Sequence, residues 1–311
     1  MREFEWDTGD LADQGGRTVV VTGASSGVGL EVTKSLVRAG ATVIAGVRNV
    51  AKMSALIPRL TDGLDGGSSG RVEARPLDVS DLRSIDAFAA ELAGDGVALG
   101  ALVNNAGISA SRFALSRDGV ELTYATNLVG AAWLAERVLP QLTGPDPRVV
   151  LVGSNFSQRT QAMPDLGAVG DPARFRQLAA YRGSKIAAAA YAVDLGERLA
   201  AAGSPVRSVI AHPGVAATAM AAQADNVVTK AIAAVVLSRL ARPADDAARS
   251  VIWSATSRDV VQGVFVGPAL RRRDRRLHVV PVRGGAADPA FRARVRDFVQ
   301  TATGESRVLG Q

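Results

Sequence analysis

Residues 21–30 read VTGASSGVGL and place Gly23, Gly27 and Gly29 between a short apolar run and a segment with helical periodicity. The run before them, RTVVVT (17–22), is rich in β-branched residues, which is typical of a buried strand. The spacing Gly-x-x-x-Gly-x-Gly is neither the Gly-x-Gly-x-x-Gly dinucleotide fingerprint nor a P-loop. Glycines at such a turn let backbone N–H groups approach a pyrophosphate, whose charge a helix N-terminus favours. A tight turn that binds nothing fits the same letters.

The alternation of apolar runs with helical patterns continues outward from this turn. Strands are expected at 17–22, 41–47, 71–77, 101–105, 148–154, 205–211 and 263–267, and helices at 28–40, 49–60 (ending near Pro58), 81–93, 118–139 and 179–202. Right-handed crossovers place each helix over the pair of parallel strands that it joins. The sequence therefore predicts one α/β domain: a doubly wound, about seven-stranded parallel sheet with helices on both faces.

Composition limits the function. The 311 residues include no cysteine, which excludes a disulfide framework and a thiolate metal site. His212 and His278 form no cluster with carboxylates at ligand spacing, so we expect no metal site. The net charge of +6 derives in part from RRRDRR (271–276), which is more typical of a solvated loop than of a nucleic-acid site. No apolar run is long enough to span a membrane and the start lacks a signal-peptide pattern, so a soluble, cytoplasmic protein is expected.

The segment YRGSK places Tyr181 and Lys185 at positions i and i+4, on one face of a helix. A neighbouring ammonium favours the phenolate, so we expect Lys185 to lower the pKa of Tyr181 into a range useful for proton transfer. Ser154 ends the strand RVVLVGS, which points its hydroxyl to the same sheet edge as the glycine turn. An exposed Tyr/Lys pair and an ordinary strand-end serine remain the alternatives.

In this order, the motifs make the chain resemble the short-chain dehydrogenase/reductase family, which has a Rossmann-type fold. The resemblance covers about residues 15–270 and rests on TGASSGVG (22–29), LDV (77–79), NNAG (104–107), TNLVG, Ser154, YRGSK and HPGVAAT (212–218). It implies a catalytic set of Asn127, Ser154, Tyr181 and Lys185. It implies that the cofactor binds Gly23, Ser25, Ser26, Gly27, Val28, Gly29, Arg48, Asp78, Val79, Asn105, Ala106, Gly107, Tyr181, Lys185, Pro213, Gly214, Val215 and Thr218.

Within the family, this sequence resembles the retinol-dehydrogenase-like branch. Tyr181 follows Ser154 by 27 residues, about twice the gap of simpler members. The added residues, 155–178, are expected to form one wall of a substrate pocket, although a plain surface elaboration would fit too. The extension 271–311 contains a helical pattern with Phe291, Val295 and Phe298, which is expected to pack on the body or on another subunit. The family resemblance also implies a homodimer or homotetramer.

The second strand ends in Val47 followed by Arg48, where NAD-preferring relatives carry an acid. An arginine there can bind a ribose 2′-phosphate, so NADP(H) is expected in preference to NAD, although Ser26 stands where many NADP-binding relatives carry a second basic residue. The expected function is an NADP(H)-dependent oxidoreductase that interconverts an alcohol and its carbonyl on an apolar small molecule. The alternatives are a non-catalytic dinucleotide-binding sensor or scaffold and a reductase of a conjugated C=C bond.

Overall fold

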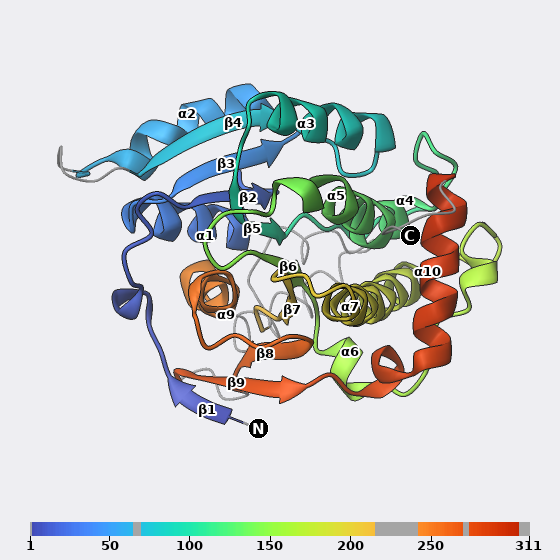
Figure 1. The fold of residues 1–311 in the computed structure, drawn as a ribbon. Helices are drawn as coiled ribbons and strands as arrows, with labels where there is room; N and C mark the ends of the chain where they lie inside the picture. The colour runs from blue at the N-terminus through green and yellow to red at the C-terminus, as the bar shows by residue number, and fades with distance from the viewer. Residues whose placement is uncertain (1, 65–69, 215–241, 270–273, 305–311) are drawn as a thin grey trace, which may run out of the picture.

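A computed structural model describes residues 2–64, 70–214, 242–269 and 274–304. Their strands form one sheet in the order β1-β9-β8-β7-β6-β5-β2-β3-β4 (Figure 1). From β8 to β4 all neighbours are parallel, so the predicted seven-stranded parallel sheet is confirmed. The strand bounds are β2 (Thr18–Thr22), β3 (Thr42–Val47), β4 (Arg71–Pro76), β5 (Leu99–Asn104), β6 (Arg148–Val152), β7 (Arg207–Ala211) and β8 (Val264–Pro268).

Two antiparallel strands that the sequence analysis missed extend one edge of the sheet. β9 (Arg276–Pro281) pairs with β8, and β1 (Arg2–Glu5) pairs with β9. The segment 271–276 was expected to be a loop, but its last residue, Arg276, begins β9. A small apolar cluster that includes Phe4, Trp253 and Leu277 lies beneath this edge.

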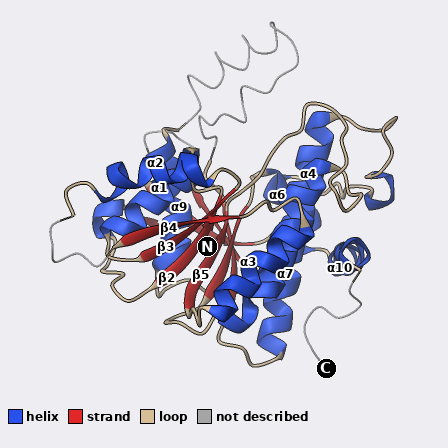
Figure 2. Ribbon diagram, turned by 90° about the horizontal axis from the view of Figure 1, so that it is seen from above, coloured by secondary structure: helices blue, strands red, loops and turns tan. Residues whose placement is uncertain are grey.

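Helices cover both faces of the sheet (Figure 2). The side chains of β2 alternate between the two resulting cores, with Val19 and Val21 on one face and Val20 on the other. The first core packs under α1 (Gly27–Arg38), α2 (Val50–Thr61) and α9 (Ala244–Thr256). The second packs under α3 (Leu82–Gly94), α5 (Gly130–Val138), α7 (Gln177–Ala201) and α10 (Pro289–Thr303). Pro58 lies inside α2 and does not end it.

The single helix expected at 118–139 is divided. It consists of a short α4 (Leu122–Tyr124), a π-helical segment (Ala125–Val129) and α5. π-helical turns insert one extra residue into a helix and frequently occur at functional sites. The π-helical segment carries Asn127, so the irregularity falls on a predicted site residue.

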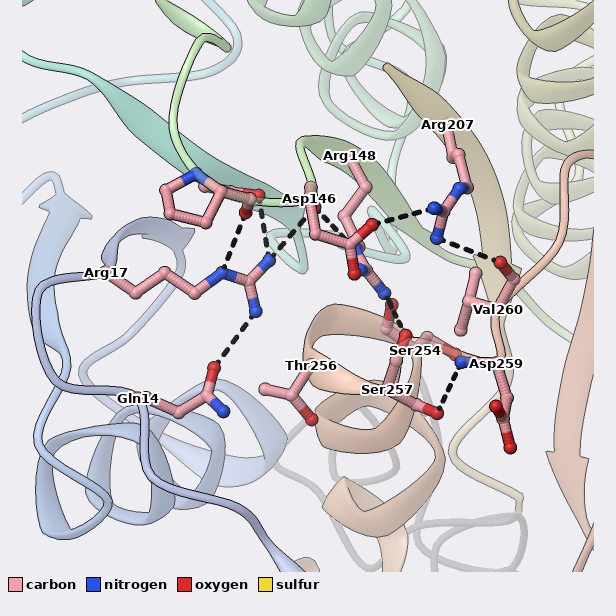
Figure 3. Close-up of polar contacts among 12 residues, drawn as sticks. Gln14, Arg17, Asp146, Arg148, Arg207, Ser254, Thr256, Ser257, Asp259 and Val260 are labelled. Atoms are coloured by element: carbon pink, nitrogen blue, oxygen red, sulfur yellow. Dashed lines mark hydrogen bonds and ion pairs between the residues drawn. The ribbon is translucent and has the colours of Figure 1, made fainter. Parts of the chain in front are cut away.

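The amino edge of the sheet is closed by arginines (Figure 3). Arg148 is fully buried and donates to the carbonyls of Ser254 (3.2 Å) and Ser257 (2.7 Å) at the end of α9. Arg17 donates to the carbonyls of Pro145 and Gly100, and Arg207 forms an ion pair with Asp146 at 2.8 Å. Burial lowers the pKa of Arg148 to about 10. Side chains therefore fill this edge, in contrast to the carboxyl edge, where the predicted site residues gather.

Candidate functional site

The glycine turn joins β2 to α1 at the carboxyl edge. Gly23 and Gly27 have φ angles of 65° and 54°, which favour glycine. A Cβ atom at Gly29 would overlap the carbonyl of Gly23 and the side-chain amide of Asn105. Each of the three glycines is therefore required by the local backbone conformation or packing.

Hydrogen bonds hold the ends of β2 and β5 together beside this turn. Thr22 Oγ1 accepts from the backbone N–H groups of Asn105 (3.0 Å) and Ala106 (2.9 Å), and Asn105 Nδ2 donates to the Thr22 carbonyl (2.9 Å). Sequence reasoning did not select Thr22, although it is the first letter of the quoted TGASSGVG. This pairing places Asn105, Ala106 and Gly107 next to the glycine turn.

The N-terminus of α1 has the form of an anion site. Its N-cap residue, Ser26, is exposed and makes no side-chain capping bond, whereas the Asn49 and Asp81 side chains cap α2 and α3. Among the described residues, no N-cap side chain accepts a hydrogen bond from the first N–H groups of α1. Ser25 lies half-buried in the turn and Val28 packs into the core below. This end of the helix fits a pyrophosphate.

The next two strand ends hold the predicted ribose and adenine contacts. Val47 is buried at the end of β3, and the Arg48 side chain is exposed, with no ion pair to any residue that the structure describes. Asp78, after β4, accepts from the backbone N–H (2.9 Å) and hydroxyl (2.7 Å) of Ser80. The buried Val79 packs against Gly130, where any Cβ would overlap the Val79 carbonyl.

Three of the predicted residues meet directly. A Cβ atom built on Gly107 would lie 3.1 Å from Asn127 Oδ1 and 3.3 Å from Lys185 Nζ. Asn127 Oδ1 also accepts from the Ile108 backbone N–H at 2.8 Å, and Lys185 Nζ donates to the carbonyl of Val152 at 2.8 Å. The predicted lysine and asparagine therefore converge on the loop that follows β5.

Tyr181 and Ser154 flank the same region. Ser154 lies two residues beyond β6, and the adjacent α6 (Phe156–Arg159) places the Phe156 ring edge-on to the Tyr181 ring, with centroids 6.3 Å apart. Both Ser154 and Lys185 are buried, whereas Tyr181 is partly exposed. Tyr181 is thus the most exposed of the four predicted catalytic residues.

The pKa directions differ from expectation. Burial raises the pKa of Tyr181, so the prediction that Lys185 lowers it is wrong for this structure. The reason lies in the lysine itself: its ammonium donates to the Val152 carbonyl, and burial lowers its own pKa to about 8. At neutral pH Tyr181 carries its proton.

Ser184 is a site residue that sequence reasoning missed. Its fully buried Oγ accepts from Asn127 Nδ2 (2.9 Å) and donates to the Tyr181 carbonyl (2.9 Å). The available signal was its place in YRGSK, one residue before Lys185. Ser184 links the π-helical segment to the first turns of α7.

The loop after β7 also lies at the carboxyl edge of the sheet, and the structure describes it as far as Gly214. Gly214 has a φ of 78°, and its absent Cβ would lie 3.0 Å from Pro268, while Pro213 is half-buried. His212 is buried and stacks on Phe265 at 5.8 Å, and burial lowers its pKa to about 3. Two further predicted contacts, Val215 and Thr218, lie outside the described residues. In the described part, no group of histidine and acidic side chains could hold a metal ion, and no helix could cross a membrane.

Residues 155–178 lie beside Tyr181. They contain α6 and a 3-10 turn (Leu166–Ala168), and they contact the loop after β5: the rings of Phe113 and Phe175 pack edge-on at 5.9 Å, and Gln177 Nε2 donates to the Ser109 carbonyl at 3.2 Å. Leu178, one helical turn before Tyr181, is 61% exposed. Together with Phe156, which packs on the Tyr181 ring, Leu178 makes the part of this segment nearest Tyr181 apolar.

Comparison with known proteins decides the family. A family model described as short chain dehydrogenase matches residues 17–228, more than half of the chain. The chain belongs to the short-chain dehydrogenase family. The family prediction is confirmed, and with it membership of a family of NAD(P)-dependent oxidoreductases.

The relatives of this short-chain dehydrogenase are named for different activities. Mouse retinol dehydrogenase 14 is 30% identical over 68% of this chain and 64% of its own, and mouse polyprenol dehydrogenase is 32% identical over 67% and 62%. The human WW domain-containing oxidoreductase is 34% identical over 64% of this chain, which spans about half the length of that relative.

A solved structure of an uncharacterised protein from Mycobacterium paratuberculosis matches 97% of the short-chain dehydrogenase described here and 98% of its own chain. It has a TM-score of 0.77 and 33% identity. A second structure, from Beutenbergia cavernae, is described as an NAD(P)-dependent gluconate 5-dehydrogenase with NADP bound at low occupancy. It has a TM-score of 0.61 and 27% identity, and covers 82% of this chain and 96% of its own.

Proposed function

We propose that this protein is an NADP(H)-dependent oxidoreductase that interconverts an alcohol and its carbonyl on an apolar small molecule. The observation that carries the proposal is the convergence of Lys185 Nζ and Asn127 Oδ1 on Gly107. Gly107 belongs to the loop that Thr22 and Asn105 hold against the glycine turn. A cationic side chain that can act on a phenol thus lies beside a turn built for a dinucleotide.

The residues at the carboxyl edge fit a dinucleotide in order. The N-terminus of α1 would bind the pyrophosphate, Asp78 and Val79 the adenine, and Asn105–Gly107 the adjacent ribose. The nicotinamide end would meet Lys185 and Pro213–Gly214. Bound there, the nicotinamide supplies or accepts the hydride.

The chain supplies the proton. In the reductive direction Tyr181 Oη donates its proton to the carbonyl oxygen as the hydride reaches the carbon, and the oxidative direction reverses this transfer. The raised pKa of Tyr181 keeps the phenol protonated at neutral pH. In the structure the Lys185 ammonium donates to the Val152 carbonyl, so we infer that it turns toward the phenolate only as that charge forms. The Ser154 hydroxyl would hydrogen-bond the substrate oxygen as charge develops on it.

The Asn127 side chain has a positioning role in this proposal. Nδ2 donates to the Ile108 carbonyl (2.9 Å) and to Ser184 Oγ, and Oδ1 accepts from the Ile108 N–H. Both ends of the amide are therefore engaged. They fix the loop at Gly107 relative to the helix that carries Tyr181 and Lys185.

Arg48 supports NADP(H) over NAD(H). Its guanidinium is exposed at the end of β3 and pairs with no acid among the described residues, so a 2′-phosphate there would gain a charge-assisted hydrogen bond without first breaking an internal ion pair. The buried Val47 offers no acid for a 2′-hydroxyl.

The apolar substrate class follows from the surface beside the phenol. Phe156 packs edge-on against the Tyr181 ring and the exposed Leu178 lies one helical turn before Tyr181, and pocket walls of this kind select apolar ligands.

The experiment is a panel of apolar ketones, aldehydes and enones followed by NADPH consumption at 340 nm, with product analysis. We expect carbonyl reduction that Tyr181→Phe abolishes while NADPH binding, measured by fluorescence, persists. Binding without turnover of any compound would instead support a sensor or scaffold, and saturated products from enones would support a C=C reductase.

A further inference from the structure

Gly183 lies in YRGSK between the two predicted catalytic residues of α7, and Tyr124 packs directly against it. A Cβ atom at Gly183 would overlap the Tyr124 hydroxyl and would lie 3.0 Å from Pro164 Cβ. The phenol oxygen therefore occupies a notch in α7 that exists only because residue 183 has no side chain.

Tyr124 cannot move away easily. It is 4% exposed, and its backbone N–H donates to Glu121 Oε2 at 3.1 Å. Its ring packs edge-on against Phe298 of α10, with centroids 6.2 Å apart, and α10 packs crosswise against α7 (Figure 1). Burial is the main reason that the pKa of Tyr124 is raised, so the hydroxyl stays neutral. The Tyr124 hydroxyl in this notch is therefore uncharged and held in place.

The contact lies between catalytic elements. Gly183 is two residues from both Tyr181 and Lys185, and Tyr124 is three residues before Asn127. The hydrogen bond from Asn127 to Ser184 joins the same two segments next to it. Two adjacent contacts thus set the distance between the π-helical segment and the catalytic turn of α7, one by attraction and one by steric contact.

We propose that Tyr124 is a positioning residue, whose hydroxyl in the Gly183 notch sets the placement of the Tyr181–Lys185 turn against the Asn127 segment. The inference rests on the proposed function for its kinetic consequence, but the placement itself can be measured without turnover. Neither residue touches the reacting atoms in this proposal; both act through α7.

The test is a double-variant cycle. Gly183→Ala drives a methyl group against the Tyr124 hydroxyl, so kcat is expected to fall at least tenfold, with KM changed less than threefold. Tyr124→Phe removes the oxygen and is expected to lower kcat only two- to threefold. Combining the two gives the methyl group the space that the oxygen left, and kcat should return to within about threefold of Tyr124→Phe alone.

The matched control is Gly196→Ala in the same helix. A Cβ there would lie 2.8 Å from Gln262 Nε2, so this variant also disturbs a tight glycine contact, but far along α7 from Tyr181. It should lower the melting temperature and leave kcat unchanged. A wild-type kcat in Gly183→Ala, or a double variant as slow as Gly183→Ala, would overturn the proposal.

A spectroscopic readout separates this inference from the proposed function. The chain has three tyrosines, so 2-fluorotyrosine labelling gives three ¹⁹F signals, and Tyr181→Phe assigns one of them. We expect Gly183→Ala to move the Tyr181 signal, the double variant to return it, and Gly196→Ala to leave it in place. If no substrate is turned over but the signal behaves in this way, the positioning holds and the proposed reaction fails. An unmoved signal in Gly183→Ala contradicts the positioning whatever the turnover.

Discussion

Asn127 Nδ2 donates a hydrogen bond to Ser184 Oγ at 2.9 Å, and this bond joins the π-helical segment to the helix that carries Tyr181. The Ser184 hydroxyl in turn donates a hydrogen bond to the Tyr181 carbonyl. The tyrosine backbone is thereby tied to the asparagine through one hydroxyl.

Ser184→Ala should therefore impair catalysis more than cofactor binding. Loss of a buried hydrogen-bond partner costs about 1–3 kcal/mol, and we expect kcat to fall about tenfold while the Kd for NADPH changes little. Steady-state kinetics and fluorescence titration measure the two. Ser208→Ala is the control, since that buried hydroxyl donates to the Ala192 carbonyl (2.7 Å), farther along α7. Equal losses of kcat in both variants would count against a specific role of Ser184.

Gly29→Ala should weaken dinucleotide binding. The added methyl group overlaps the Gly23 carbonyl and the Asn105 amide, so the turn must open, and the Kd for NADPH should rise at least about tenfold. Gly94→Ala is the control, because a Cβ there meets nothing within 4 Å. Circular dichroism establishes that both proteins are folded. A folded Gly29→Ala protein with wild-type affinity would show that the dinucleotide binds elsewhere.

Arg48→Leu should reduce the preference for NADPH. A charge-assisted hydrogen bond to a 2′-phosphate is worth about 1.5–3 kcal/mol, so the Kd for NADPH should rise roughly tenfold or more while that for NADH stays constant. Arg59→Leu, at the exposed end of α2, removes the same charge away from the site. If wild-type protein binds NADH more tightly than NADPH, the assignment of Arg48 is wrong.

His212 should make the protein sensitive to acid. Burial lowers its folded-state pKa from 6.5 to about 3, so the unfolded state takes up a proton first as the pH falls. The stability from this group is present above pH 6.5 and is lost between pH 6.5 and 3, by up to about 1.4 kcal/mol per pH unit. Urea unfolding of wild type and His212→Leu from pH 7 to 4 measures the effect. The variant should lose less stability over this range, and parallel curves would exclude the histidine as the cause.

The parallel part of the fold was predictable because its strands, apart from the edge strand β4 (RVEARP), carry a local apolar run. β1 and β9 could not be predicted from the sequence. Their pairing joins Arg2–Glu5 to a segment near the other end of the chain, and a short strand such as REFE lacks an apolar pattern. Non-local pairing of this kind leaves no mark on local periodicity.

The site shows the same division between local pattern and tertiary environment. The glycine turn and the convergence of Lys185 with Asn127 followed from ordered motifs. The pKa of Tyr181 could not be predicted in this way. Whether it is raised or lowered depends on burial and on which acceptor the Lys185 ammonium binds, and helical spacing determines neither. Likewise, the sequence TYATNLVG does not predict a π-helical turn or the contact of Tyr124 with Gly183.

The wide turn at Ala125–Val129 also determines where Asn127 lies relative to the helices on either side of it. A π-helical turn holds one more residue than an α-helical turn while rotating the chain by about the same angle, so removing one residue between Tyr124 and Gly130 would give a regular helix whose two ends keep their relative orientation. Residue 127 would nevertheless be displaced within the narrower turn, and its amide could no longer face Ile108 while Gly130 stayed against Val79. The length of this segment is therefore as strict a requirement as the identity of any side chain on it, and natural or engineered deletions should be tolerated here less well than point substitutions.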